Sequence, residues 1–193
     1  MIRPMLAALC LICAGPAVAQ DFSEGSEART WNLFAEEPAR FTATVTDPLC
    51  ELSGQCAENC GNGTRQLVLL READGVMVFP LKNGQPAFTG AVNELAPFCG
   101  QSIEVDGLML NDPEIGAQNV YLIQRLKPEG EEWRRANQWT KDWAAENPGA
   151  TRPNGSEKGP WFRRDARIQA IIDEQGYLGL GPEVDQAFFE EWF

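Results

Sequence analysis

The sequence predicts a mainly β protein with some α-helix: a small five-stranded barrel or roll, followed by a helical C-terminal extension. Three observations support this prediction. Between residues 40 and 127, apolar and β-branched residues occur in short runs that turn-forming residues separate. One segment with helical periodicity lies between the third and fourth of these runs. From residue 128 onward the pattern is helical, and five of the six tryptophans occur there.

Each predicted strand is bounded by turn residues. Asp47-Pro48 ends the first strand, and Asn111-Asp112-Pro113 separates the fourth from the fifth. The sequence Glu72-Ala73-Asp74-Gly75 predicts a tight hairpin between the second and third strands. The strands are expected at residues 41–46, 66–71, 76–81, 103–110 and 119–126.

The helix within this domain is predicted over residues 88–98, where apolar residues stand at positions 88, 91, 92, 95 and 98. The resulting order is strand-strand-strand-helix-strand-strand. That order is the connectivity of an OB-type barrel, a small five-stranded Greek-key architecture. We favour this OB-like barrel over a generic β-sandwich or roll.

The chain outside the barrel divides into three parts. Residues 1–19 form a signal peptide, and residues 20–39 a polar lead-in whose Phe22 and Trp31-Leu33-Phe34 cluster is expected to dock on the main body. Residues 40–127 are the OB-like β domain, and residues 128–193 the aromatic helical extension. In that extension, helices are expected at residues 131–146, at residues 163–175 and from Pro182 onward.

The first nineteen residues resemble an export signal in their organisation. Arg3 supplies a charged start, residues 5–14 an apolar run, and Ala17-Val18-Ala19 a small-residue cleavage site before Gln20. The apolar run is too short to span a bilayer as a helix. We therefore expect a soluble protein that is periplasmic or secreted after cleavage.

Four cysteines follow the predicted cleavage site: Cys50, Cys56, Cys60 and Cys99. An even number of cysteines in an oxidising compartment predicts disulfide bonds, and three pairings of these four are possible. The C-x5-C-x3-C spacing lacks the C-x2-C pairs typical of zinc and iron–sulfur sites. A redox pair of Cys56 and Cys60 is also disfavoured, because the charge of Glu58 would raise the pKa of the thiols.

Composition excludes several kinds of chemistry. The chain has no histidine, which removes Ser-His-Asp and Cys-His catalysis and every histidine-ligated metal site. Its formal net charge of -12 argues against a nucleic-acid partner, since phosphate binding depends on Lys and Arg. A hydrolase based on two carboxylates would need these groups on opposite sides of a cleft, and the sequence does not show such an arrangement. We assign no catalytic residue, no metal ligand and no cofactor.

The most distinctive candidate for binding is the run from Lys158 to Asp165, which concentrates bases and aromatic residues in an acidic chain. Trp and Arg are favoured at binding hot spots. The candidate binding residues are Trp139, Trp143, Trp161, Phe162, Arg163 and Arg164. The favoured alternative is structural: Trp161 and Phe162 dock the C-terminal helices on the barrel, and the arginines pair with local acids.

These features predict an exported, non-catalytic accessory or binding protein, stapled by disulfides, that serves a periplasmic or envelope protein complex. A protein partner is expected, whereas nucleic acid and a transmembrane segment are not. Two alternatives belong to other classes: a cysteine-based redox or metal-binding protein, and a carboxylate-dependent hydrolase.

Overall fold

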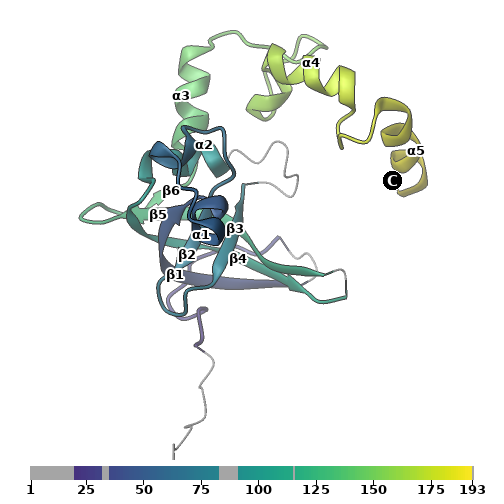
Figure 1. The fold of residues 1–193 in the computed structure, drawn as a ribbon. Helices are drawn as coiled ribbons and strands as arrows, with labels where there is room; N and C mark the ends of the chain where they lie inside the picture. Colours follow the sequence, from purple (N-terminus) through teal and green to yellow (C-terminus); the bar gives the residue numbers. More distant parts are fainter. Residues whose placement is uncertain (1–19, 32–34, 83–90, 115, 193) are drawn as a thin grey trace, which may run out of the picture.

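The computed structural model describes residues 20–31, 35–82, 91–114 and 116–192 and contains a closed five-stranded β-barrel, as predicted (Figure 1). The sheet has the order β3-β2-β1-β4-β5-β6, and an additional parallel pairing of β3 with β5 closes it into a barrel. This is the predicted OB-type connectivity. The strands are β1 (Glu36–Thr46), β2 (Val68–Arg71), β3 (Met77–Leu81), β4 (Ser102–Asp112), β5 (Ala117–Pro128) and the short β6 (Arg134–Arg135).

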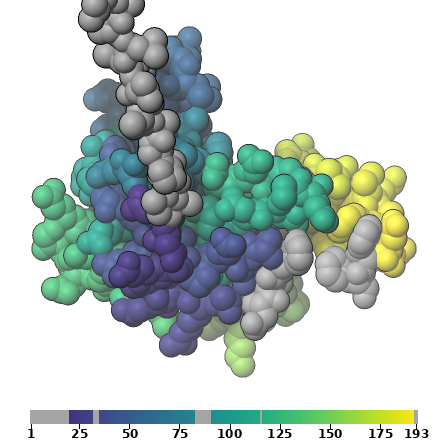
Figure 2. All heavy atoms as spheres, turned by 90° about the horizontal axis from the view of Figure 1, so that it is seen from below, coloured from purple at the N-terminus to yellow at the C-terminus, as the bar shows by residue number. Residues whose placement is uncertain are grey.

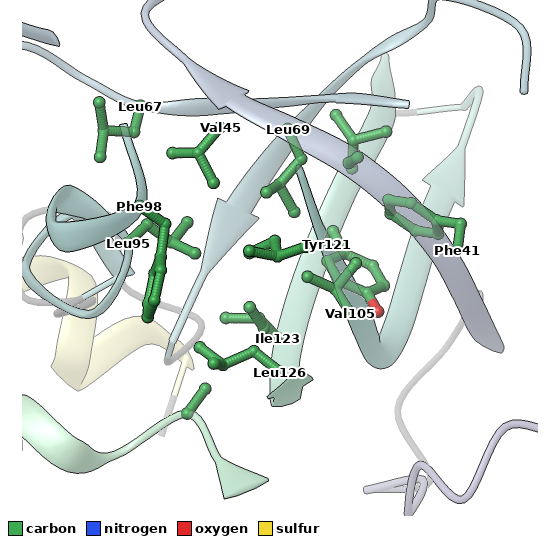
Figure 3. Packing of buried hydrophobic residues seen from close by; sticks show 14 of the residues in the cluster. Phe41, Val45, Leu67, Leu69, Leu95, Phe98, Val105, Tyr121, Ile123 and Leu126 are labelled. Carbon is green, nitrogen blue, oxygen red and sulfur yellow. The ribbon is translucent and has the colours of Figure 1, made fainter. Parts of the chain in front are cut away.

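Alternation along the strands fills the barrel interior. In β1, Ala39, Phe41, Ala43 and Val45 are buried, while the residues between them lie nearer the surface. Figure 3 shows the side chains of Phe41, Val45, Leu69, Val105, Tyr121 and Ile123 converging inside the barrel. The Tyr121 hydroxyl donates to the carbonyl of Ala39 over 2.8 Å, which satisfies the polar group in this apolar interior.

Helix α2 (Ala91–Leu95) and the 3-10 turn η3 (Ala96–Phe98) lie between β3 and β4, where the sequence predicts a helix. Leu95 and Phe98 are buried and join the barrel core. The predicted start of this helix at Phe88 lies outside the described residues. Of the lead-in, Phe22 does dock on the barrel: its ring meets that of Phe41 edge-on at 5.9 Å between centroids.

The loop between β1 and β2 is held by two disulfides, Cys50–Cys56 and Cys60–Cys99. The predicted disulfide bonding is therefore confirmed, and the structure selects one of the three pairings. Helix α1 (Pro48–Ser53) begins in this loop, where the Asp47 carboxylate accepts from the backbone N–H of Cys50 over 2.8 Å. The 3-10 turn η1 (Glu58–Gly61) carries Cys60, whose bond to Cys99 fastens the loop to the residues before β4.

The first predicted C-terminal helix is wrong over residues 131–137. Arg134 and Arg135 form β6, pairing with Leu126 and Arg125 on β5, and helix α3 (Gln138–Glu146) begins only afterwards. The strand forms because β5 offers an unpaired edge there, a partner that helical periodicity in the sequence cannot reveal.

The other two predicted helices are present. Helix α4 (Ala166–Gln175) begins three residues later than predicted, because η4 (Trp161–Arg163) precedes it and Asp165 caps its first turn. Helix α5 (Pro182–Trp192) begins at Pro182, as predicted. Helices α4 and α5 lie to one side of the barrel, beyond α3 (Figure 1), and the space-filling view from below also shows the C-terminal residues at one side (Figure 2). No helix of the described residues is both long and apolar enough to cross a membrane.

Candidate binding site

The C-terminal helices are connected to the barrel by a contact between helix α2 and the start of α3. Glu94 of α2 is buried, and its carboxylate accepts from the backbone N–H groups of Gln138 (2.9 Å) and Thr140 (3.4 Å). Asn137 occupies the N-cap position but makes no side-chain capping bond. Glu94 therefore supplies the negative charge and the acceptors that the start of a helix requires. This contact ties the start of α3 to the barrel.

The structure brings four of the six candidate binding residues together, with Trp139, Trp143 and Phe162 arranged around Trp161. The Trp161 ring centroid lies 4.5 Å from that of Trp139, 5.9 Å from that of Trp143 and 6.1 Å from that of Phe162. Ring contacts continue from Phe162 to Tyr177 and from Tyr177 to Phe189, so they reach α5. We call these six rings, Trp139, Trp143, Trp161, Phe162, Tyr177 and Phe189, the aromatic cluster.

The aromatic cluster packs the C-terminal helices against one another. Trp143 and Phe162 are buried, yet neither belongs to the buried cluster that fills the barrel. Sequence reasoning favours docking of Trp161 and Phe162 onto the barrel; among the described residues, the ring contacts of these two side chains run to α3 and to the segment before α5. The C-terminal segment therefore has a small core of its own.

The two arginines contact rings instead of acids. The Arg163 guanidinium lies 4.2 Å from the Tyr177 ring centroid, and that of Arg164 lies 5.2 Å from the Trp143 ring. Within the described part of the chain, neither makes an ion pair, although sequence reasoning favours pairing with local acids. These cation–π contacts make both arginines part of the packing of the aromatic cluster.

A buried carboxylate completes this packing. Asp165 accepts from the indole Nε1 of Trp143 over 3.1 Å and from the backbone N–H of Arg167 over 2.9 Å. The Arg167 guanidinium donates two further bonds, at 2.8 and 3.1 Å. Chiefly because of the Arg167 side chain, and also through its backbone N–H and Trp143, the pKa of Asp165 falls to about 2.

The outer surface of the C-terminal segment carries large apolar side chains. Val184 and Phe188 are four residues apart on α5, which places them on one side of that helix, and Leu180 lies in the loop just before it. Together with Ile171 on α4, they have between 38% and 59% of their surface exposed. We call Ile171, Leu180, Val184 and Phe188 the apolar face. The spacing of Val184 and Phe188 can be seen in the sequence, whereas no local pattern in the sequence marks Leu180 as exposed.

The apolar face is bordered by negative charge. Helix α5 carries Glu183, Glu190 and Glu191 at its surface and contains no basic residue. Its fourth acid, Asp185, is buried and accepts from the backbone N–H groups of Leu178 and Leu180, which shapes the loop that leads into α5. The site is therefore an apolar surface with an acidic border.

The cysteines of the proposed redox or metal-binding alternative form disulfide bonds. All four cysteines from residue 50 to residue 99 are bonded to one another in pairs. In the described ranges, no group of three or more Cys, Asp and Glu side chains is placed to hold a metal ion.

Fold and site together define a class: a closed OB-type barrel with a disulfide-bonded β1–β2 loop, joined to an aromatic helical segment with its own core. Protein-family models, curated proteins and solved structures contain no match to this chain.

Proposed function

We propose that the protein is an exported, non-catalytic accessory protein that binds a protein partner through the apolar face of its C-terminal segment. One observation carries this proposal: four large apolar side chains are exposed on a segment that is held together by its own aromatic cluster. Exposed apolar surface with a polar border is typical of interaction sites. A segment with its own core can present that surface without rearrangement of the barrel.

The charge around the apolar face suggests the chemistry of the partner. Residues spaced by four along α5 suit binding of the helix in an apolar groove. Because α5 carries only acidic charges, a groove bordered by Lys and Arg would be complementary to it. A second copy of this chain is a poor partner, since the same acidic borders would meet and the whole chain carries a formal charge of -12.

Export is proposed from the organisation of residues 1–19, with cleavage before Gln20 and a periplasmic or secreted mature protein. The two disulfides support this compartment, because such bonds persist mainly in oxidising environments. N-terminal sequencing of the protein recovered from the periplasm or medium should give Gln20 as the first residue. Recovery of the protein only from the cytoplasm with Met1 retained would contradict export.

Site-specific photocrosslinking tests the partner proposal. A photoreactive residue at position 184 should give one adduct in the envelope fraction of the producing cell, and its partner should be identified by mass spectrometry. Val184→Asp, combined with Leu180→Asp, should abolish co-purification of that partner. Leu52→Asp is the matched control, because Leu52 is 72% exposed on α1 of the barrel.

The proposal also predicts that the partner has basic residues beside its apolar groove. Reversal of those charges should weaken the complex, and raising the salt concentration should do the same. An unaltered complex in the Val184→Asp/Leu180→Asp variant, or equal loss in Leu52→Asp, would overturn the proposal.

A further inference from the structure

A second surface feature lies on the barrel and shares no residue with the apolar face. A hollow of about 630 Å³ opens between the N-terminal segment, the end of β3, strand β5 and strand β6. Leu122 and Ile123 contribute to its floor. Its polar and aromatic lining includes Arg29, Trp31, Lys82, Arg125 and Arg135. Its volume is within the range of about 300–1,000 Å³ that is usual for small-molecule sites.

An irregularity in β5 builds one wall of the hollow. The register of β4 with β5 shifts between Asp106 and Gly107, which leaves two consecutive residues, Gln124 and Arg125, between the core residues Ile123 and Leu126. Bulges of this kind redirect side chains at the rims of barrels. Both side chains reach the N-terminal segment instead of the core.

These contacts hold the N-terminal segment in place. The Gln124 amide accepts from the backbone N–H of Arg29 over 2.9 Å and donates to its carbonyl over 2.8 Å. The buried Asp106 carboxylate accepts from the Ser26 hydroxyl (2.6 Å) and from the backbone N–H of Glu27 (2.9 Å). The wall that carries Arg29 and Trp31 is thus anchored on both β4 and β5.

The lining of the hollow is cationic in an otherwise acidic protein. Its four bases face one acid, Glu27, and Glu27 forms an ion pair with Arg125. Of the residues that the structure describes, none forms an ion pair with the side chain of Arg29, Lys82 or Arg135. Three cations without a direct ion pair among the described residues therefore border one hollow.

Lys82 is partly desolvated and interacts with one carboxylate, that of Glu94, and one guanidinium, that of Arg135. Burial is the main cause that lowers the pKa of Lys82; the charge of Glu94 raises this pKa, and the charge of Arg135 lowers it by a smaller amount. The Glu94 carboxylate accepts the hydrogen bonds at the start of α3 and does not line the hollow. A bound anion would relieve the repulsion between Lys82 and Arg135.

We propose that this hollow binds a small organic anion, whose carboxylate or phosphate group lies against Lys82, Arg135 and Arg29 and whose ring packs on Trp31. Arginine and lysine together suit either oxyanion. Trp31 has 49% of its surface exposed and offers an aromatic face at the mouth. The formal charge of -12 on the whole chain disfavours a polyanion, so the ligand is small and its charge is compensated locally.

Calorimetric titration of the purified protein tests this inference with three probes: galacturonate, glucose 6-phosphate and neutral glucose. Saturable binding of either anion, with no binding of glucose, supports the site and identifies the oxyanion. Lys82→Met and Arg135→Ala should each weaken that binding by about tenfold or more, as expected for loss of a charged hydrogen-bond donor. Lys158→Met is the control, because Lys158 lies in the loop before η4 and outside the hollow.

Fluorescence provides a second readout. Binding should change tryptophan emission, and Trp31→Phe should remove that change while calorimetric binding persists. Circular dichroism should show that all variants remain folded. Three results would overturn the inference: neither anion binds saturably, glucose binds as tightly as the anions, or Lys82→Met and Lys158→Met bind equally well.

Discussion

The indole Nε1 of Trp143 donates a hydrogen bond of 3.1 Å to the buried carboxylate of Asp165, and this contact joins helix α3 to the first turn of α4. Trp143 thus contributes to the C-terminal segment in two ways: its ring belongs to the aromatic cluster, and its N–H satisfies the acid that caps α4. Because α3 is tied to the barrel through Glu94, the same contact connects the barrel to the apolar face.

Trp143→Phe should loosen the C-terminal segment. The substitution keeps an aromatic ring but removes the donor to a buried carboxylate, a loss of about 1–3 kcal/mol. Hydrogen exchange in residues 138–192 should become faster, while the barrel strands stay protected. Trp139→Phe is the control, because Trp139 packs against Trp161 but makes no hydrogen bond through its indole in the described structure. Equal acceleration in both variants would count against a specific role for the indole N–H.

Acid should weaken the same segment before it unfolds the barrel. The pKa of Asp165 is about 2 in the folded protein, against an ordinary value of 3.8. Because the folded pKa is the lower one, the stabilisation is complete above about pH 4 and is lost as the pH falls toward 2. It amounts to about 1–2 kcal/mol, reduced because the Arg167 side chain is largely exposed.

Near-ultraviolet circular dichroism, which reports on the tryptophans, should therefore change between pH 4 and pH 2. In Asp165→Asn this contribution should be absent, and the remaining signal should follow other carboxylates. An identical acid transition in the parent protein and in Asp165→Asn would show that Asp165 makes no contribution.

The two disulfides should contribute unequally to stability. Cys60–Cys99 joins residues 39 apart in sequence, whereas Cys50–Cys56 joins residues only 6 apart. Restriction of the unfolded chain predicts about 4 kcal/mol for the longer loop and about 2 kcal/mol for the shorter. Urea unfolding of Cys60→Ser/Cys99→Ser should therefore have a lower midpoint than that of Cys50→Ser/Cys56→Ser. The reverse order would show that local packing in the β1–β2 loop outweighs loop entropy.

Gly107→Ala should damage the barrel itself. A Cβ atom at this position would lie 2.3 Å from the carbonyl oxygen of Leu122 and 2.9 Å from the Tyr121 ring. Strands β4 and β5 would have to separate, at a cost of about 1–3 kcal/mol or more. Thermal unfolding should occur at a lower temperature than in Thr42→Ala, an exposed substitution on β1. Similar melting of the two variants would mean that β5 moves aside easily.

Much of the fold follows from local patterns in the sequence. The hairpin turn at Asp74-Gly75 and the end of the helix predicted at residue 175 depend on neighbouring residues, so the hairpin and the end of α4 are predicted well. Strand β6 was missed because nothing local marks Arg134-Arg135 as a strand. Its conformation depends on the open edge of β5.

For the candidate sites too, some features follow from the sequence and others depend on the tertiary structure. The sequence shows that bases and aromatic residues are concentrated after residue 128, and that four cysteines are available for bonding. Whether Trp161 and Phe162 pack on the barrel or on other helices depends on contacts among α3, η4 and α5, which lie far apart in sequence.

Composition and short-range periodicity thus sufficed for the barrel class, the helical extension and the expectation of disulfides, because each depends on residues within one or two turns of the chain. The pairing of the cysteines depends on contacts between residues far apart in sequence. The same is true of the hollow, where closure of the barrel brings Arg29, Lys82 and Arg135 together. The parallel pairing of β3 with β5 brings Lys82 beside β5, and the β5 bulge anchors the N-terminal segment opposite it. No local pattern encodes those neighbours, since only the closed sheet places them together.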